Sequence, residues 1–284
     1  MCVTFFYFAK SGDIGKYKLI FINNRDEFLD RQTLSASWSD GVLCGRDLQD
    51  KAKGTWLGVS KNDENTFKLS NLLNITTKKV DIIKDAKSRG EITINYLKNN
   101  ETLYDYCRKL EDEAFKYNGF HLITIEKKKD DDIKCCVLSN RLIDKVETLQ
   151  YLPGIYGFGN SGIHKPYKKV ERGLKIFSDF INNKMKTNEN IEEDDIIEEC
   201  LKILKDNTKC LPDHVMEELY EYPITNFSSI FQTHPPSIRY GTRTHTIITI
   251  DRNDKVTFFE LTAENINSNL SDIKWIEHKY TFQL

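Results

Sequence analysis

The chain has 284 residues, with 41 Lys and Arg against 43 Asp and Glu, and 39% of its residues are hydrophobic. This length and composition predict a folded, soluble protein with a sizeable core, and the near-neutral charge argues against a nucleic-acid-binding role. No apolar run approaches the roughly 18 residues that a membrane helix needs. The seven cysteines show no C-x-x-C spacing, so they predict reduced thiols and neither a zinc ribbon nor a thioredoxin-type centre.

Four pairs of apolar segments, each pair separated by a short polar turn, predict antiparallel hairpins. The pairs are 2–9 with 17–24, 55–60 with 66–71, 119–126 with 133–139, and 242–251 with 255–261. Such short turns exclude a parallel crossover, which needs a dozen or more residues. A last strand is expected over 273–283, and the proline-rich stretch 207–241 is expected to form a loop.

Helical periodicity lies between these hairpins. The expected helices are 88–99, 101–115, 166–183 and 190–206. Because the predicted strands are apolar on both faces, their sheets need cover on both sides. The simplest arrangement is an α+β fold with four layers, an α/β/β/α sandwich of two antiparallel sheets, in a single domain over 1–284. The alternative is one mixed sheet with helices on both faces.

Cys2 is the first candidate catalytic residue. Removal of the initiator Met would leave a thiol and a free α-amine on one residue, and an α-amine can act as base for its own side-chain nucleophile. The alternative is that Cys2 is a small apolar residue that opens a buried strand. An unusually polar run, NNRDE at 23–27, follows the second strand, and the hairpin would bring it beside Cys2. There, Arg25 would favour a thiolate and Asp26 would orient an amine; the alternative is a solvated turn.

Three further groups of residues are candidates from the later strands. Arg243 shares with His245 the expected interior face of a strand, so Arg243 needs a carboxylate, a bound anion or a wet cavity. His245 is a candidate ligand-binding residue, or else a hydrogen-bonded core residue. Asn71 and Asn160 each carry an amide that can donate to an oxyanion or a carboxylate, although each is also typical of a turn.

Several motifs together resemble the transport and Golgi organisation protein 2 family, also called the NRDE family. They run in the family's order along the chain: the N-terminal MCVTFF, NRDEF at 24–28, GTWLG at 54–58, SRGE at 88–91, YNGF at 117–120, LPGIYG at 152–157, Asn160-Ser161, and YGTRT at 240–244. The resemblance implies a role in secretory traffic and Golgi organisation, in mitochondrial and lipid homeostasis, and in moving haem. It implies a cytoplasmic protein with mitochondrial and Golgi association.

A more distant similarity is to N-terminal nucleophile hydrolases of the cholylglycine hydrolase type, which share the four-layer architecture. Their pattern places Cys2, Asp26, Asn71, Asn160 and Arg243 in one catalytic site. The chain departs from that pattern because Asn23 stands three residues before Asp26, where these hydrolases have an Arg.

Two functions follow from these resemblances. The first is a carrier or trafficking factor that binds a hydrophobic anionic ligand, such as an acyl lipid or labile haem as cargo, through Arg25, Arg243 and His245. The second is a Cys2-dependent amidohydrolase. We expect no resident cofactor or metal, no nucleic-acid partner and no transmembrane segment. We do expect a peripheral association with organelles.

Overall fold

The computed structural model describes residues 1–13, 15–62, 66–129, 131–185, 191–220, 223–233, 238–264 and 273–284. Part of the predicted turn at 61–65 and the pair Pro235-Pro236 lie outside these residues. The described chain forms two compact units. Unit 1 contains Met1–Asp30, Pro153–Gly159 and Pro166–Gln283, and unit 2 contains Arg31–Leu152, Asn160–Lys165 and Leu284. A single domain over 1–284 stays a prediction.

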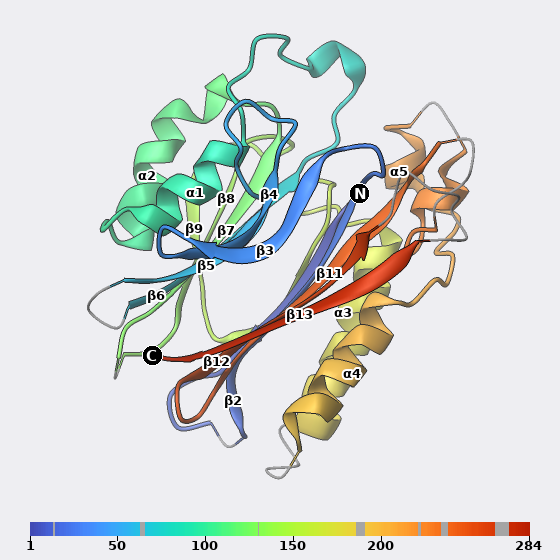
Figure 1. Ribbon diagram of the computed structural model, residues 1–284. Coiled ribbons are helices and arrows are strands. Elements are labelled where there is room, and N and C mark those ends of the chain that lie inside the picture. The colour runs from blue at the N-terminus through green and yellow to red at the C-terminus, as the bar shows by residue number, and fades with distance from the viewer. Residues whose placement is uncertain are drawn as a thin grey trace. The chain divides into compact units, whose positions relative to one another are not determined.

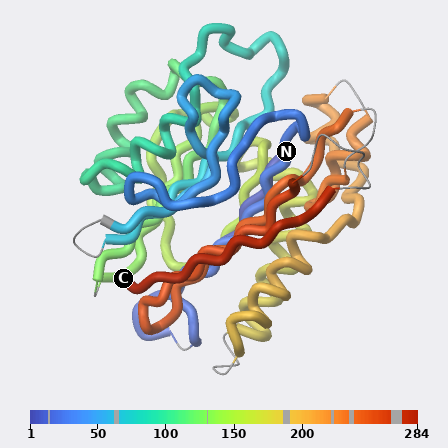
Figure 2. The backbone as a smooth tube through the Cα atoms, viewed as in Figure 1, coloured from blue at the N-terminus to red at the C-terminus, as the bar shows by residue number. Residues whose placement is uncertain are grey.

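Unit 1 is built on a six-stranded antiparallel sheet with the order β10-β1-β2-β11-β12-β13. Its strands are β1 (Val3–Phe8), β2 (Tyr17–Phe28), β10 (Gly154–Phe158), β11 (Tyr240–Asp251), β12 (Lys255–Glu264) and β13 (Lys274–Gln283). Strands from opposite ends of the chain lie side by side at its centre, where blue β2 pairs with orange β11 (Figures 1 and 2).

Helices of unit 1 pack on one face of this sheet. They are α3 (Lys168–Phe180), which continues into a π-helical turn at Ile181–Met185, and α4 (Glu193–Leu204). Val3, Phe5 and Tyr7 of β1 join the core beneath these helices. The opposite face of β1 is also buried, and there the ring of Phe6 stacks on Phe21 at 5.7 Å between centroids. Both faces of β1 are therefore covered, as its unbroken apolar sequence predicts.

Unit 2 is built on a seven-stranded antiparallel sheet whose strands follow one another in chain order. They are β3 (Thr33–Ser39), β4 (Val42–Asp47), β5 (Leu57–Asn62), β6 (Thr66–Asn74), β7 (Phe120–Lys127), β8 (Lys134–Ser139) and β9 (Thr148–Tyr151). The helices α1 (Gly90–Lys98) and α2 (Leu103–Glu113) contact this sheet. Two antiparallel sheets with helices confirm the α+β class, and the alternative of one mixed sheet is wrong.

Two predictions about local structure need correction, and four short strands were missed. β2 continues through the polar run to Phe28, because β11 pairs with it along that whole length. The stretch 207–241 contains two short helices, α5 (His214–Glu217) and a 3-10 turn at Ile224–Phe227. The short strands β3, β4, β9 and β10 were not predicted from the sequence, since they have few consecutive β-branched or aromatic residues.

Two family-like motifs of unit 2 meet through glycine. A Cβ atom at Gly54 would lie 2.3 Å from the carbonyl carbon of Gly90, so only glycine permits this approach of two backbones. The guanidinium of Arg89 donates to the carbonyl oxygen of Gly119 at 2.7 Å, which joins a third motif to the same region. These motifs therefore assemble the scaffold of unit 2.

A buried histidine fastens the end of the β7–β8 hairpin to the segment that follows β10. Nε2 of His121 lies 2.7 Å from the carbonyl oxygen of Ser161, to which it donates, and Nδ1 lies 2.7 Å from the hydroxyl of Ser139, from which it accepts. Burial lowers the pKa of His121 to about 4. The neutral ring is thus the form that the fold requires.

We expect the free energy of unfolding to fall as the pH drops from about 6.5 to about 4. Over that window the unfolded chain binds a proton at His121 and the folded chain does not, which amounts to about 3 kcal/mol. Chemical denaturation across this pH range measures the effect. His121→Gln should make this part of the pH profile less steep by that amount, and an unchanged profile in that variant would contradict the assignment.

Candidate functional site

Polar side chains occupy the second half of β2 although the strand is buried there. Asn23, Asn24, Arg25 and Asp26 are all at most 4% exposed. Successive side chains of a strand point to opposite faces, so Asn24 and Asp26 share the helix-covered face with Ile20 and Ile22. A buried polar group needs a partner. Asn23, Asn24 and Asp26 each find one in a segment distant in sequence, whereas Arg25 pairs with Glu27 of its own strand.

Asp26 is the centre of the cluster on the helix-covered face. Its Oδ1 accepts a hydrogen bond of 2.6 Å from the hydroxyl of Thr242, and its Oδ2 lies 3.6 Å from the α-amine of Met1. The same amine donates to the hydroxyl of Tyr240, which in turn donates to the backbone oxygen of Asp26 at 3.3 Å. The strands β1, β2 and β11 thus meet at one carboxylate.

Cys2 lies against the backbone of the same residue. Its Sγ is 3.4 Å from the amide nitrogen of Asp26, which donates to it. The carbonyl oxygen of Met1, next to Cys2 in the chain, accepts hydrogen bonds of 3.1 Å from both Nζ of Lys169 and Nε2 of Gln232. Two side-chain donors therefore converge on the peptide group that precedes the thiol.

Burial dominates the electrostatics of this cluster. It lowers the pKa of the Met1 amine and raises the pKa of Asp26, while the attraction between the two opposes both shifts. Burial also lowers the pKa of Lys169 to about 8 and raises the pKa of the Cys2 thiol. With Met1 in place, Cys2 therefore carries a protonated thiol and an amide nitrogen in place of a free amine.

A pocket of about 700 Å³ opens beside Met1. Its walls are mainly aromatic and aliphatic, and the described residues that line it are Met1, Phe28, Tyr220, Pro223, Asn226, Phe227, Ile238 and Tyr240. Phe28 contacts Tyr240 edge to face at 5.0 Å between centroids, and Phe227 contacts Tyr240 at 5.8 Å. Because Met1 and Tyr240 also belong to the Asp26 cluster, the pocket and the cluster share a wall.

The two predicted arginines of unit 1, Arg25 and Arg243, have different partners near this cluster. Arg25 forms an ion pair of 3.6 Å with Glu27. Arg243 lies at a β-bulge of β11, and its guanidinium donates to the carbonyl oxygen of Phe28, a pocket residue, at 3.0 Å. The bulge adds one residue to the strand, so simple alternation from Arg243 to His245 is interrupted.

His245 is enclosed in the core of unit 1. Its ring stacks on Trp275 at 5.0 Å and on Phe231 at 5.8 Å, and its Nδ1 lies 2.6 Å from Oδ1 of Asn24, to which it donates. Burial lowers its pKa to about 3. The hydrogen-bonded core interpretation describes this environment, and a ligand-binding role for His245 stays a prediction.

Asn71 and Asn160 belong to unit 2 and are both buried. Asn71 donates from Nδ2 to the carbonyl oxygen of Trp56 at 3.1 Å, and Asn160 donates to that of Asn74 at 2.6 Å. Each therefore has a structural partner on a neighbouring chain segment of its own unit. A common site for them with Cys2, Asp26 and Arg243 stays a prediction.

Reasoning from the sequence missed Lys169 and Gln232 as members of the cluster. Lys169 had a detectable signal, because it lies on the same helical stripe as Gly173 and Phe177, four and eight residues later. A lysine on such an apolar stripe has to be buried with a partner. Gln232 had no comparable signal, since it lies in an irregular segment.

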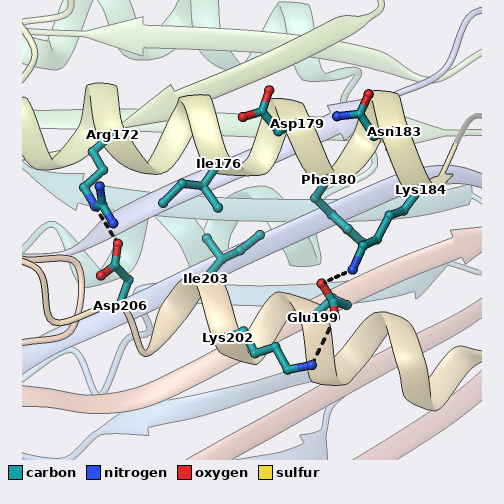
Figure 3. Close-up of a pocket in the computed structure, with 10 residues that line it drawn as sticks. All are labelled: Arg172, Ile176, Asp179, Phe180, Asn183, Lys184, Glu199, Lys202, Ile203 and Asp206. Carbon is teal, nitrogen blue, oxygen red and sulfur yellow. Dashed lines mark hydrogen bonds and ion pairs between the residues drawn. The ribbon is translucent and has the colours of Figure 1, made fainter.

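Unit 1 has a second hollow, of about 450 Å³, between α3 and α4 (Figure 3). Ile176, Phe180 and Ile203 give it an apolar lining. Ion pairs bridge its two ends, between Arg172 and Asp206 at 2.7 Å and between Lys184 and Glu199 at 2.8 Å. These contacts explain the hollow as the seam between two packed helices.

Two kinds of feature are absent from the residues that the structure describes. Within them, no three His, Cys, Asp or Glu side chains converge in the way that metal ligands do. No helix in the same part of the chain is both long and apolar enough to cross a membrane.

The two antiparallel sheets with their helices define an α+β protein, and comparison with known proteins identifies its family. The family Transport and Golgi organisation 2 matches residues 1–265, and the chain belongs to it. The Transport and Golgi organization 2 homolog of Mus musculus is 30% identical over 292 residues, which cover 100% of this chain and 99% of that protein. The Transport and Golgi organization protein 2 of Drosophila melanogaster is 30% identical and covers 94% of both chains.

Among solved structures, the chain is similar to Anbu from Hyphomicrobium sp. strain MC1. The TM-score is 0.40 at 9% identity, covering 98% of this chain and 87% of that one. Anbu (ancestral beta-subunit) from Yersinia bercovieri gives a TM-score of 0.37 at 8% identity, with 71% and 72% of the two chains covered.

We expect Asp26→Asn to reduce the free energy of unfolding by about 3 kcal/mol, because it leaves the Met1 amine and Lys169 buried without their carboxylate. Denaturant titration measures the loss. In a double-mutant cycle, Lys169→Met should recover part of it by removing one of the two buried cations. Strict additivity of the two substitutions would show that Asp26 and Lys169 are not coupled.

Proposed function

We propose that this chain serves transport and Golgi organisation by carrying a hydrophobic, anionic ligand in the pocket beside Met1. The observation that supports this most directly is the pocket itself, with its wall of Phe28, Tyr220, Phe227 and Tyr240. A volume of about 700 Å³ lies in the range of sites for small-molecule ligands and cofactors, which are also mainly apolar. The role in transport rests on the name of the family, Transport and Golgi organisation 2.

The electrostatics beside the pocket favour an anionic head group. Lys169 is fully buried, and Asp26, the carboxylate whose charge most favours its protonated form, lies beyond ion-pair distance of its Nζ. Its ammonium group donates to the carbonyl oxygen of Met1, and Met1 lines the pocket. Arg243 adds a second positive charge behind Phe28. An acyl lipid with a carboxylate, or labile haem with its propionates, combines the apolar body and the negative charge that this environment accepts.

We expect oleate to bind more tightly than oleyl alcohol, which has the same chain without the charge. Lys169→Met should remove most of that preference, because the alcohol does not use the buried cation. Equilibrium titration followed by intrinsic fluorescence measures both affinities. Equal affinity for oleate and oleyl alcohol in the unmodified protein would contradict an anion-selective pocket.

The apolar wall is tested separately. Phe28→Ala should weaken oleate and haem alike by about tenfold, since it removes a large contact surface. Phe28 is 52% exposed, so its truncation spares the core, and Phe115→Ala is a matched control at 67% exposure outside the pocket. The proposal fails if neither ligand saturates the protein, or if both variants behave alike.

A Cys2-dependent amidohydrolase is the second candidate function, and one observation favours it. Lys169 and Gln232 donate to the carbonyl group adjoining Cys2, so removal of Met1 would leave these donors beside a free Cys2 amine. Asp26 would lie close to the same amine and could orient it. The carrier is preferred because Asn23, which donates to Val3 and Thr4, occupies the position of the hydrolases' Arg.

We expect Cys2→Ala to keep oleate affinity within about twofold and to restore transport in cells that lack the protein, because a carrier needs the pocket and not the sulfur. Secretion of a reporter protein and the shape of the Golgi measure this rescue. Intact-mass measurement of the purified chain shows whether Met1 is retained. Loss of rescue by a folded, normally abundant Cys2→Ala protein, together with removal of Met1, would reverse the preference in favour of the hydrolase.

A further inference from the structure

Unit 2 exposes two aliphatic side chains at the tip of one loop. Val80 is 87% exposed and Ile82 is 51% exposed, and Val80 is the most exposed large hydrophobic residue in the described part of the chain. They lie on and just after a 3-10 turn at Lys79–Asp81 that buries none of its residues. This loop, drawn in teal, stands clear of the rest of unit 2 (Figures 1 and 2). Two such exposed apolar groups within three residues make this loop a candidate binding surface.

Lysines flank these two aliphatic residues in the sequence. Lys78, Lys79 and Lys84 are exposed, and neither Lys78 nor Lys84 has an ion-pair partner among the described residues. Asp81 and Asp85 are the acidic residues of the same segment, and Lys87 is paired with Glu113 at 3.3 Å. The tip therefore has a positive balance, with four lysines against two aspartates from 78 to 87.

The backbone behind the tip is held in a defined conformation. The side chain of Asn118 accepts from the amide nitrogen of Ile83 at 2.8 Å and donates to its carbonyl oxygen at 3.1 Å. The amide nitrogen of Lys87 donates to the carbonyl oxygen of Lys116 at 2.9 Å. Val80 and Ile82 are thus presented outward by a braced loop, which reduces the entropy lost on binding.

We propose that the loop 78–84 docks unit 2 on the surface of an anionic phospholipid bilayer. Val80 and Ile82 enter the boundary between head groups and acyl chains, and Lys78, Lys79 and Lys84 lie among the anionic head groups. Lysine is depleted at protein–protein interfaces, whereas each lysine near an anionic bilayer strengthens binding about fivefold. Two exposed aliphatic residues flanked in sequence by exposed lysines therefore match a lipid surface better than a protein partner. The loop is separate from the pocket residues, so this inference does not depend on the proposed ligand.

Binding of this kind is weak and reversible. Two aliphatic side chains bury far less apolar surface than an acyl anchor, so the electrostatic contribution of the lysines is needed as well. Exposed charges are screened by salt, and the affinity for anionic vesicles should fall as salt rises. Vesicles of phosphatidylcholine alone should bind the protein poorly at any salt concentration.

The test is co-flotation of the full chain with vesicles of phosphatidylcholine and phosphatidylserine, compared with phosphatidylcholine alone. Val80→Asn with Ile82→Asn should lower the partition coefficient by about tenfold or more. Replacement of Lys78, Lys79 and Lys84 by Gln should lower it by roughly a hundredfold. These exposed side chains make no core contacts, so the variants should unfold at the same temperature as the parent chain.

Leu152→Asn is the matched control. Leu152 is 77% exposed in the same unit, and no Lys or Arg lies within six residues of it in the sequence. Its substitution should leave vesicle binding unchanged. The proposal is overturned if the parent chain does not float with anionic vesicles, if the loop variants float as well as the parent, or if Leu152→Asn loses as much binding as they do.

Discussion

A strand that carries four consecutive polar residues through a protein interior can fold only if each of them finds a partner, and β2 of unit 1 obeys this constraint. Asn23 donates to Val3 and Thr4 of β1. Asn24 donates to the carbonyl oxygens of Leu204 and Ile230, at the end of α4 and in the segment before β11. Asp26 holds Thr242 of β11 and the amine of Met1. The polar run thus joins segments that are up to about two hundred residues apart.

The hairpins could be predicted because their information is local: two apolar runs and a short turn determine the pairing of β1 with β2 and of β11 with β12. The central pairing of β2 with β11 could not be predicted in this way, since it depends on contacts between distant segments. The same dependence explains the wrong end of β2. Five polar residues indicate a turn by composition, whereas partners from distant segments, such as Thr242 and His245 of β11, keep them in a strand.

In the candidate site, too, local contacts could be predicted from the sequence and contacts between distant segments could not. The polar run with Asp26 was predicted to lie beside Cys2 because a hairpin brings the end of its second strand near the start of its first, and the structure shows that contact. Lys169 and Gln232 reach the cluster from α3 and from an irregular segment, so no local pattern specifies their approach. Arg243 illustrates a third limit. A β-bulge changes the face of the sheet to which a side chain points, and the alternation of residues in the sequence does not predict the bulge.

Met1 and Tyr240 belong both to the pocket wall and to the cluster around Asp26. A ligand bound in the pocket would therefore also change the electrostatics of the cluster. Burial lowers the pKa of the Met1 amine, and Asp26 is the nearby charge that opposes this most strongly. An anionic head group bound against Met1 would add a second negative charge, which favours the protonated amine. Binding of such a ligand would then be accompanied by uptake of protons, and the same linkage means that raising the pH weakens the affinity. A neutral ligand of equal size would leave the protonation of the Met1 amine unchanged, because it would pack against the aromatic wall without adding a charge beside the amine.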